Sequence, residues 1–227
     1  MRPCLPLLSC AAGLLAAGVL ACAAPAGAVA PPNVLTPMTV DAIGGAARPV
    51  LAADGTAHVA YLNVNESFEI TLRVAERTPS STDFTTVYTS GTGAVFENPA
   101  AAVAPNGDVT IVWATMSGGH QVLTSVTSNH ATGEWTMDPD PVSTSTANVQ
   151  EPDLITDAHG NMTATWIDNG HIDAARRSAQ TGEWSAPQTL TGDRSGGHPD
   201  IAVDGDDNVT VFWSWSDGPG GATSTYS

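Results

Sequence analysis

The 227-residue chain contains no lysine, and seven arginines are its only strongly basic side chains. Against them stand 23 Asp and Glu residues, which give a formal net charge of −16 at pH 7. Such an acidic surface repels nucleic acid and anionic lipid, because it has too few cations to neutralise phosphate groups. The composition therefore argues against nucleic-acid binding and favours solubility.

Cysteine is absent after residue 22, since Cys4, Cys10 and Cys22 all lie in the first 30 residues. This segment holds one cation, an apolar run from residue 11 to residue 22, and small residues ending at Ala30. The pattern predicts a secretory signal peptide over residues 1–30, and the run is too short to span a bilayer, which needs about 20 residues. Residues 19–22 also resemble a lipobox, so a lipoprotein anchored through Cys22 is the alternative.

Without thiols, the mature chain can form no disulfide, zinc–thiolate site or cysteine nucleophile. Removal of residues 1–30 also removes one arginine and no acid, so the net charge falls by one. The remaining chain is long enough to fold around a hydrophobic core of its own.

Four stretches of this chain repeat one pattern at intervals of about 50 residues. Each opens on a residue followed by proline: Arg48-Pro49, Asn98-Pro99, Glu151-Pro152 and His198-Pro199. In the last three repeats a tryptophan follows the proline by fourteen residues, at Trp113, Trp166 and Trp213, and Tyr61 takes its place in the first. A turn residue stands six positions before each aromatic side chain: Gly55, Gly107, Gly160 and Asp207.

Within each repeat the residues alternate with a period of two, which predicts β-strands. Val109, Ile111 and Trp113 are expected on one face, and Thr110 and Val112 on the other. A short strand before each turn completes a hairpin. A third strand follows, and the two Thr-Gly-Glu-Trp segments predict fourth strands that begin at Trp135 and Trp184. No segment has helical periodicity.

Four strands in each of four repeats indicate an all-β fold, a β-propeller. We expect the domain over residues 31–227, with blades at about 48–97, 98–150, 151–197 and 198–227. The last repeat has sequence for only three strands, and residues 34–49 resemble residues 184–199. We therefore expect a strand at 34–41 to complete the last blade and close a monomeric four-bladed ring. A dimer sharing one larger ring and a fragment of a longer repeat protein are the alternatives.

These repeats resemble the secreted propeller repeats of actinobacteria, in which Pro-x-apolar-Ala-x-Asp precedes Gly-x-x-Thr-x-x-Trp. They are also distantly similar to sialidase-like propellers, which carry an Asp box, Ser-x-Asp-x-Gly-x-Thr-Trp, at the turn into the fourth strand. Residues 178–184 lack the Asp and one residue of that box, and His130 replaces the Asp within residues 128–135. The resemblance implies an exported bacterial propeller, and it implies no activity, because the box is structural in sialidases too.

The basic residues do not support sialidase chemistry, which needs three arginines converging on the substrate carboxylate. The mature chain has six: Arg48, Arg73, Arg77, Arg176, Arg177 and Arg194. Arg176 and Arg177 are neighbours in a strand and are expected to point to opposite faces. General glycosidase chemistry needs two acids about 5 to 10 Å apart, and spacing alone singles out no pair among so many acids.

Other catalytic and metal-binding patterns are missing as well. The sequence has no Gly-x-Ser-x-Gly and no phosphate-binding loop, and its histidines form no H-x-H or H-x-x-x-H pair. We therefore predict no catalytic residue, no metal site and no cofactor. Calcium favours oxygen clusters such as Asp204, Asp206 and Asp207 with Asn208, but the other turns lack the cluster, and we interpret it as a solvated loop. The sequons at Asn65, Asn161 and Asn208 matter only in a eukaryotic host.

Tryptophans are the remaining candidates for a binding surface. We expect Trp113, Trp166 and Trp213 to pack between blades, because they recur at one strand position. We expect Trp135 and Trp184 to pack at blade edges. Trp215 has no counterpart in the other repeats and is the candidate for stacking on a sugar or a peptide.

The sequence thus predicts an exported, non-catalytic propeller that binds or scaffolds carbohydrate or another extracellular protein through loops at one mouth of the ring. A divergent glycoside-acting enzyme and a truncated repeat array without independent function are the alternatives. Acids that converge in one pocket would favour the enzyme. A groove with an exposed Trp215 and no converging acids would favour the binding module.

Overall fold

The computed structural model describes residues 44–95, 97–144, 148–192, 194–215 and 222–226. The predicted signal peptide, including Cys22, and the predicted strand at 34–41 lie outside these residues. The described part contains fifteen strands in four antiparallel sheets and no helix, which confirms the all-β prediction. None of its segments is a helix long and apolar enough to cross a membrane.

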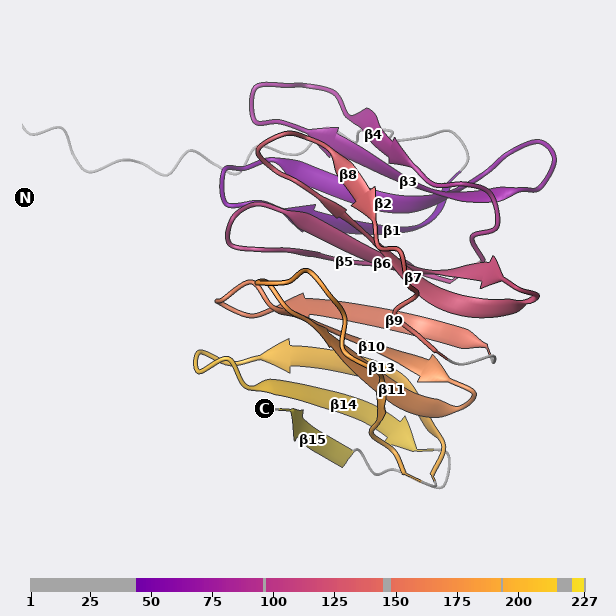
Figure 1. The fold of residues 1–227 in the computed structure, drawn as a ribbon. Helices are drawn as coiled ribbons and strands as arrows, with labels where there is room; N and C mark the ends of the chain where they lie inside the picture. The colour runs from indigo at the N-terminus through magenta and orange to yellow at the C-terminus, as the bar shows by residue number, and fades with distance from the viewer. Residues whose placement is uncertain (1–43, 96, 145–147, 193, 216–221, 227) are drawn as a thin grey trace, which may run out of the picture. The chain divides into compact units, whose positions relative to one another are not determined.

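Each sheet is built from strands that follow one another in the chain (Figure 1). The first sheet contains β1 (Gly44–Leu51), β2 (Ala57–Val64), β3 (Ile70–Arg77) and β4 (Thr85–Thr89). The second contains β5 (Ala100–Val103), β6 (Val109–Ser117), β7 (His120–Ser128) and β8 (Trp135–Met137). The third contains β9 (Val149–Thr156), β10 (Met162–Asp168), β11 (His171–Arg177) and β12 (Gln188–Thr189). The fourth contains β13 (Gly196–Val203), β14 (Val209–Trp215) and β15 (Ala222–Tyr226).

The turn between the first two strands of each sheet uses the residue that the sequence pattern singled out. Gly55, Gly107 and Gly160 have φ values of 87°, 93° and 84°, and Asp207 has a φ of 62°. Glycine adopts this left-handed conformation at little cost, and Asp tolerates it better than most residues. The repeated turn residue is therefore dictated by backbone geometry.

The constant spacing between proline and tryptophan also has a structural cause. In the third sheet Glu151 and Pro152 together lie opposite Trp166, between the pairs Gln150–Ile167 and Asp153–Thr165. His198 and Pro199 lie opposite Trp213 in the fourth sheet in the same way. Where two residues of one strand lie opposite a single residue of the next, the strands form a β-bulge. Proline is tolerated there because its missing N–H group is not needed for the ladder.

In each of the last three repeats, the strands place one tryptophan against the preceding sheet. Trp113 packs with Leu62 and Leu72 of the first sheet, together with Val109 and Ile111. Trp166 packs against the second sheet, and Trp213 against the third. The alternating pattern of β6 is confirmed, because Val112 belongs to the cluster on the opposite face. All three tryptophans pack between sheets as predicted.

Neighbouring sheets contact one another mainly through their first strands, in the order of the sequence: β1 lies against β5, β5 against β9, and β9 against β13. One prediction about the last strands is wrong. The fourth strand of the second sheet begins at Trp135, but Trp184 makes only an isolated bridge to Arg177, and β12 begins at Gln188. Pro187 lies between them and cannot donate a backbone hydrogen bond to a continuous ladder.

Candidate functional site

The first strands of neighbouring sheets bring acidic residues together near the X-Pro bulges. Glu151 and His198 occupy these bulges with φ values of 49° and 52°, which are uncommon for residues other than glycine. Strained backbone and bulges of this kind are frequent next to binding sites, because they redirect side chains. These two positions therefore mark the centre of the candidate site.

A row of contacts links Glu97, Glu151 and His198 across the second, third and fourth sheets; we call it the carboxylate row. The Glu97 carboxylate accepts a long hydrogen bond, 3.4 Å, from the backbone N–H of Glu151. The Glu151 carboxylate accepts one from the backbone N–H of His198 at 3.1 Å and also lies 3.1 Å from His198 Nδ1. Each acid thus stabilises the strained backbone of the equivalent residue, or its neighbour, in the next sheet.

Two further acids stand immediately after the prolines of the third and fourth repeats. The carboxylates of Asp153 and Asp200 each accept a hydrogen bond from the following N–H group, of Leu154 and Ile201 respectively, at 2.9 Å. Asp153 is partly buried and Asp200 is exposed. Asp200 lies close enough to Asp153 to influence the ionisation of Asp153.

The pKa of Asp153 records this proximity. Burial raises the pKa of Asp153, the N–H of Leu154 and the charge of Arg48 oppose the rise, and the charge of Asp200 adds to it. Arg48 belongs to β1 of the first sheet, so groups from three sheets act on one carboxyl group. We call Arg48, Glu151, Asp153, His198 and Asp200 together the first-strand surface.

The first-strand surface combines hydrogen-bond acceptors with donors. Its carboxylates accept hydrogen bonds from hydroxyl groups, and Arg48 and His198 can donate to hydroxyl or ring oxygens. Two carboxyl groups in unlike environments are also the starting point for acid–base chemistry. The arrangement therefore suits a polar, hydroxyl-rich ligand.

Sequence reasoning missed most of this surface. The residue after the proline is Val50, Ala100, Asp153 and Asp200 in the four repeats. A carboxylate at the same position of two successive repeats was a usable signal, because equivalent positions of adjacent sheets lie side by side. Arg48 was considered only as a possible part of an arginine clamp.

The predicted edge packing of Trp135 and Trp184 is confirmed. Trp135 contacts the cluster between the first two sheets, with its ring 5.6 Å from that of Tyr88. Trp184 packs against the cluster between the second and third sheets, and its indole N–H donates to Ser125 Oγ at 2.9 Å. The side chain of Trp215 lies outside the described residues, so its role in stacking stays a prediction.

The acidic turn at residues 204–208 is held by its own hydrogen bonds. The Asp204 carboxylate accepts from the backbone N–H groups of Asp206 and Asn208, both at 2.9 Å. Asp157 does the same in the third sheet, where its carboxylate accepts from His159 and Asn161 N–H groups. The Asp204 carboxylate thus has the same role as Asp157 in a turn without the acidic cluster, and the interpretation as a solvated loop stays a prediction.

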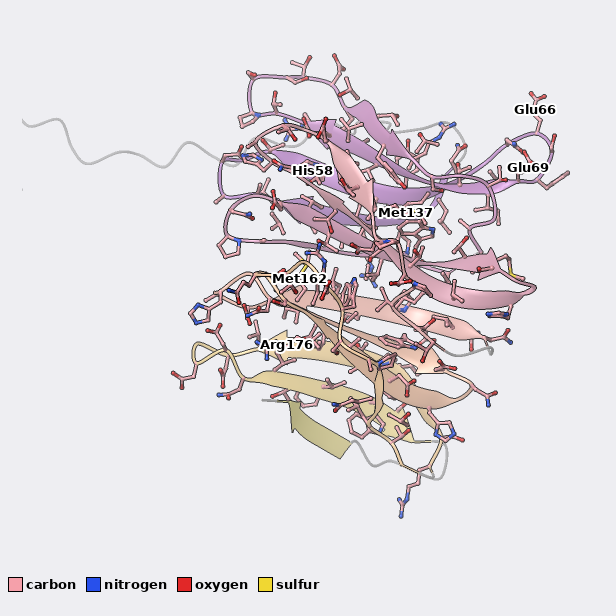
Figure 2. The ribbon with its side chains drawn as sticks, in the orientation of Figure 1. His58, Glu66, Glu69, Met137, Met162 and Arg176 are labelled. Atoms are coloured by element: carbon pink, nitrogen blue, oxygen red, sulfur yellow. The ribbon has the colours of Figure 1, made fainter. Side chains whose placement is uncertain are left out.

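Arg176 and Arg177 diverge as predicted. Arg176 Nη2 donates to Asp157 at 2.7 Å, at the turn end of the third sheet (Figure 2). Arg177 instead lies on the side of the second sheet, with Nε 3.9 Å from Asp138 Oδ2. Burial alone would raise the pKa of Asp157, but hydrogen bonds from Asn161 and His159 and the charge of Arg176 outweigh it and lower the pKa.

The Thr-Gly-Glu-Trp turns are structural. In the second sheet the Asn129 side chain accepts hydrogen bonds from the N–H groups of Ala131 and Thr132. In the third sheet Ser178 Oγ accepts from Gln180 and Thr181. Within the part of the chain that the structure describes, no group of three or more His, Cys, Asp or Glu side chains is arranged to hold a metal ion.

Comparison with known proteins supports the fold and gives no family. No family model matches the sequence, and no curated protein matches it. A protein of unknown function from Dyadobacter fermentans has a similar structure, with a TM-score of 0.58 and 14% identity over 83% of this chain. An auxiliary nutrient binding protein from Bacteroides ovatus has a TM-score of 0.51 and 16% identity over 84% of this chain. The GH43_1 enzyme from Xanthomonas citri has a TM-score of 0.51 and 9% identity over 81% of this chain.

These similarities establish a propeller-like arrangement of sheets and nothing finer, because the identities are so low. The chain spans 62% of the Dyadobacter protein, 48% of the nutrient binding protein and 70% of the GH43_1 enzyme. The prediction of a propeller-like fold is thus supported. No family model supports the more specific resemblance to actinobacterial or sialidase-like repeats.

Proposed function

We propose that this protein is a carbohydrate-binding, non-catalytic propeller module whose ligand lies on the first-strand surface. One observation carries the proposal: the first strands of the first, third and fourth sheets bring Arg48 and Asp200 within electrostatic reach of Asp153. Saccharide hydroxyls both donate and accept hydrogen bonds, so they match a surface that offers carboxylates beside a guanidinium group.

The contacts of the acids favour binding over catalysis. Glu97 and Glu151 are already engaged by backbone N–H groups of the next sheet, which fixes their positions before a ligand arrives. Fixed polar groups lose little conformational entropy on binding. The similar structures of a nutrient binding protein and a GH43_1 enzyme are consistent with carbohydrate as the ligand class.

The charge of the first-strand surface limits further which carbohydrates can bind. Carboxylates outnumber the cations on the first-strand surface, and the whole chain carries a net charge of −16. An anionic polysaccharide would meet repulsion from both. We therefore expect neutral oligosaccharides to bind and uronic-acid polymers to be rejected.

Calorimetric titration of the purified protein tests the proposal, with xylotriose and a fructan oligosaccharide as neutral probes and oligogalacturonate as the anionic one. The Asp153→Asn and Asp200→Asn variants should each weaken binding of a neutral probe about tenfold, the effect of one charged hydrogen bond. Asp206→Asn is the matched control, because Asp206 lies in the β13–β14 turn, away from the bulge. Unchanged affinity in both variants, or tighter binding of oligogalacturonate, would contradict the proposal.

A divergent glycoside-acting enzyme is the second candidate, and the raised pKa of Asp153 beside Asp200 is the observation that favours it. A carboxyl group with a raised pKa next to a second carboxyl group can divide the roles of acid and base with it. Release of reducing sugar from the same neutral probes, lost in Asp153→Asn and kept in Asp206→Asn, would identify the enzyme.

We also propose that the strand at 34–41 completes the fourth sheet and closes a four-bladed monomeric ring. The fourth sheet has three strands in the described residues, whereas each of the other three sheets has four. An unpaired sheet edge is prone to association with other chains, and pairing removes that risk. Export through a signal peptide over residues 1–30, with release into the medium, completes this proposal.

A further inference from the structure

A groove lies between the outer strands of the second and third sheets, apart from the first-strand surface. Residues 138–142 with Thr144, after β8, form one side, and residues 182–187, before β12, form the other. Its volume is about 440 Å³, within the range of small-molecule sites. We call it the edge groove.

The floor of the edge groove is held in place by contacts between the two sheets. The Trp184 indole N–H of the third sheet donates to Ser125 Oγ at 2.9 Å and to Asp138 Oδ2 at 3.2 Å in the second. The Ser125 hydroxyl also donates to Asp138, and Arg177 Nε lies 3.9 Å from the same carboxylate. The indole and its anchoring carboxylate are therefore positioned before any ligand arrives.

Prolines form much of the apolar wall. Pro139, Pro141 and Pro187 line the groove beside the Trp184 ring. A proline ring has few conformations to lose when a ligand covers it, so these walls are preorganised. An apolar face of a ligand can rest on them without reordering the protein.

The rim of the groove carries negative charge from two acidic side chains, Asp140 and Glu183. Asp140 and Glu183 are exposed, and within the described residues neither carboxylate takes part in an ion pair or hydrogen bond. No Lys, Arg or His is among the lining residues described. A ligand that fits this groove therefore has an apolar face and a positive charge.

We infer that the edge groove binds an amino sugar, with its ammonium group at Asp140 and Glu183 and its ring over Trp184 and the prolines. A pyranose ring presents an apolar C–H face and has the bulk to occupy a groove of this size. A lysine side chain carries the same ammonium group on a thin stem and would leave most of the volume unfilled. The inference concerns a second site and does not depend on the first-strand surface.

Titration calorimetry with glucosamine disaccharide tests this inference, with the N,N′-diacetylated disaccharide as the uncharged counterpart. The free amine should bind, and acetylation should weaken binding about tenfold, because a charged hydrogen bond is lost. The double variant Asp140→Asn with Glu183→Gln should cause a similar loss for the free amine only. The titrations are made in the Asp153→Asn background, in which binding at the proposed first-strand surface is weakened, so that the signal from the edge groove is separated from that of the other site.

The repeat supplies a matched control variant. Glu134 occupies the same place in the Thr-Gly-Glu-Trp segment of the second sheet as Glu183 does in the third, and it lies outside the groove. Glu134→Gln should therefore bind the disaccharide as the parent protein does. Equal binding of the acetylated disaccharide, equal loss in Glu134→Gln, or no measurable binding would each overturn the inference. Equally tight binding of trilysine would overturn the assignment to a sugar and indicate a cationic peptide.

Discussion

His58 is a basic residue buried between the first two sheets, with 4% of its surface exposed (Figure 2). It lies edge-on to the Trp135 ring, with the centroids 6.3 Å apart, and its Nδ1 is 3.7 Å from Glu76 Oε2. Burial lowers the pKa of His58, while the carboxylates of Glu76 and Asp54 oppose the shift and the charge of His130 adds to it. The folded protein therefore favours the neutral imidazole.

This shift has a defined consequence for stability at mildly acidic pH. Because the pKa of His58 is lower in the folded state, the unfolded chain binds more protons below about pH 6.5. The stabilisation is complete above that pH and is lost as the pH falls toward the folded pKa. Urea unfolding at pH 7.5 and pH 5.5 measures how much the free energy of unfolding falls between these two pH values. The fall should be smaller in His58→Phe than in the parent protein. An identical fall in the free energy of unfolding in both proteins would contradict this role of His58.

At the residue scale, the sequence revealed the core better than the site. Trp113, Trp166 and Trp213 could be assigned to packing because strand periodicity and repetition are local signals. Asp153 and Asp200 could not be singled out, because they meet only when two sheets 47 residues apart in sequence pack together. Their ionisation depends on Arg48 of a third sheet, which no local pattern encodes.

At the scale of elements, the geometry of the hairpin turns can be tested with a pair of glycines of the second sheet, one in the β5–β6 turn and one in the β6–β7 turn. Gly107 and Gly119 both have left-handed backbone, with φ values of 93° and 86°. A Cβ atom at Gly107 would lie 2.7 Å from the His130 ring, whereas at Gly119 it would meet no atom within 4 Å. An alanine at either position would have an unfavourable left-handed backbone, and of the two only the one at position 107 would also meet a side chain.

Gly119→Ala should lower the free energy of unfolding by about 1 to 2 kcal/mol, the cost of a left-handed conformation for an L-residue. Gly107→Ala should lower it by about 1 to 3 kcal/mol more, because the His130 ring must move. Chemical denaturation of the two variants measures the difference. Equal losses would show that the contact between this turn and His130 is not tight in solution.

The hairpins were easier to predict than the last strands, for a reason visible in the third sheet. A hairpin is specified by its turn residue and by alternation over a few positions, and both are present in each repeat. The fourth strand carries only a marker tryptophan, and its pairing depends on the residues immediately C-terminal to that tryptophan. After Trp184, Pro187 interrupts the ladder, so the strand shrinks to Gln188–Thr189.

At the scale of the whole molecule, the mass in solution tests ring closure. A closed ring of four blades predicts a folded monomer of about 20 kDa after loss of the signal peptide, compared with 23.2 kDa for all 227 residues. Light scattering gives this mass, and thermal unfolding in the same buffer shows whether the chain is cooperatively folded.

Deletion of residues 31–43 sharpens this experiment, because it removes the proposed closing strand and leaves every described residue in place. The deleted protein should unfold at a lower temperature and associate through the exposed edge of the fourth sheet. A discrete dimer of the intact mature chain would instead indicate two copies sharing one larger ring. An aggregating or non-cooperative chain would indicate a fragment of a longer repeat protein.

The carboxylate row gives the repeat array a direction. Glu97 and Glu151 each accept a hydrogen bond from the following sheet, and His198 has no carboxylate to continue the series. The repeats are therefore not interchangeable modules, although their strands are alike. Insertion of a copy of the third repeat after itself would add one more carboxylate contact to the row. A copy of the fourth repeat would add none, because its bulge carries a histidine in place of the glutamate.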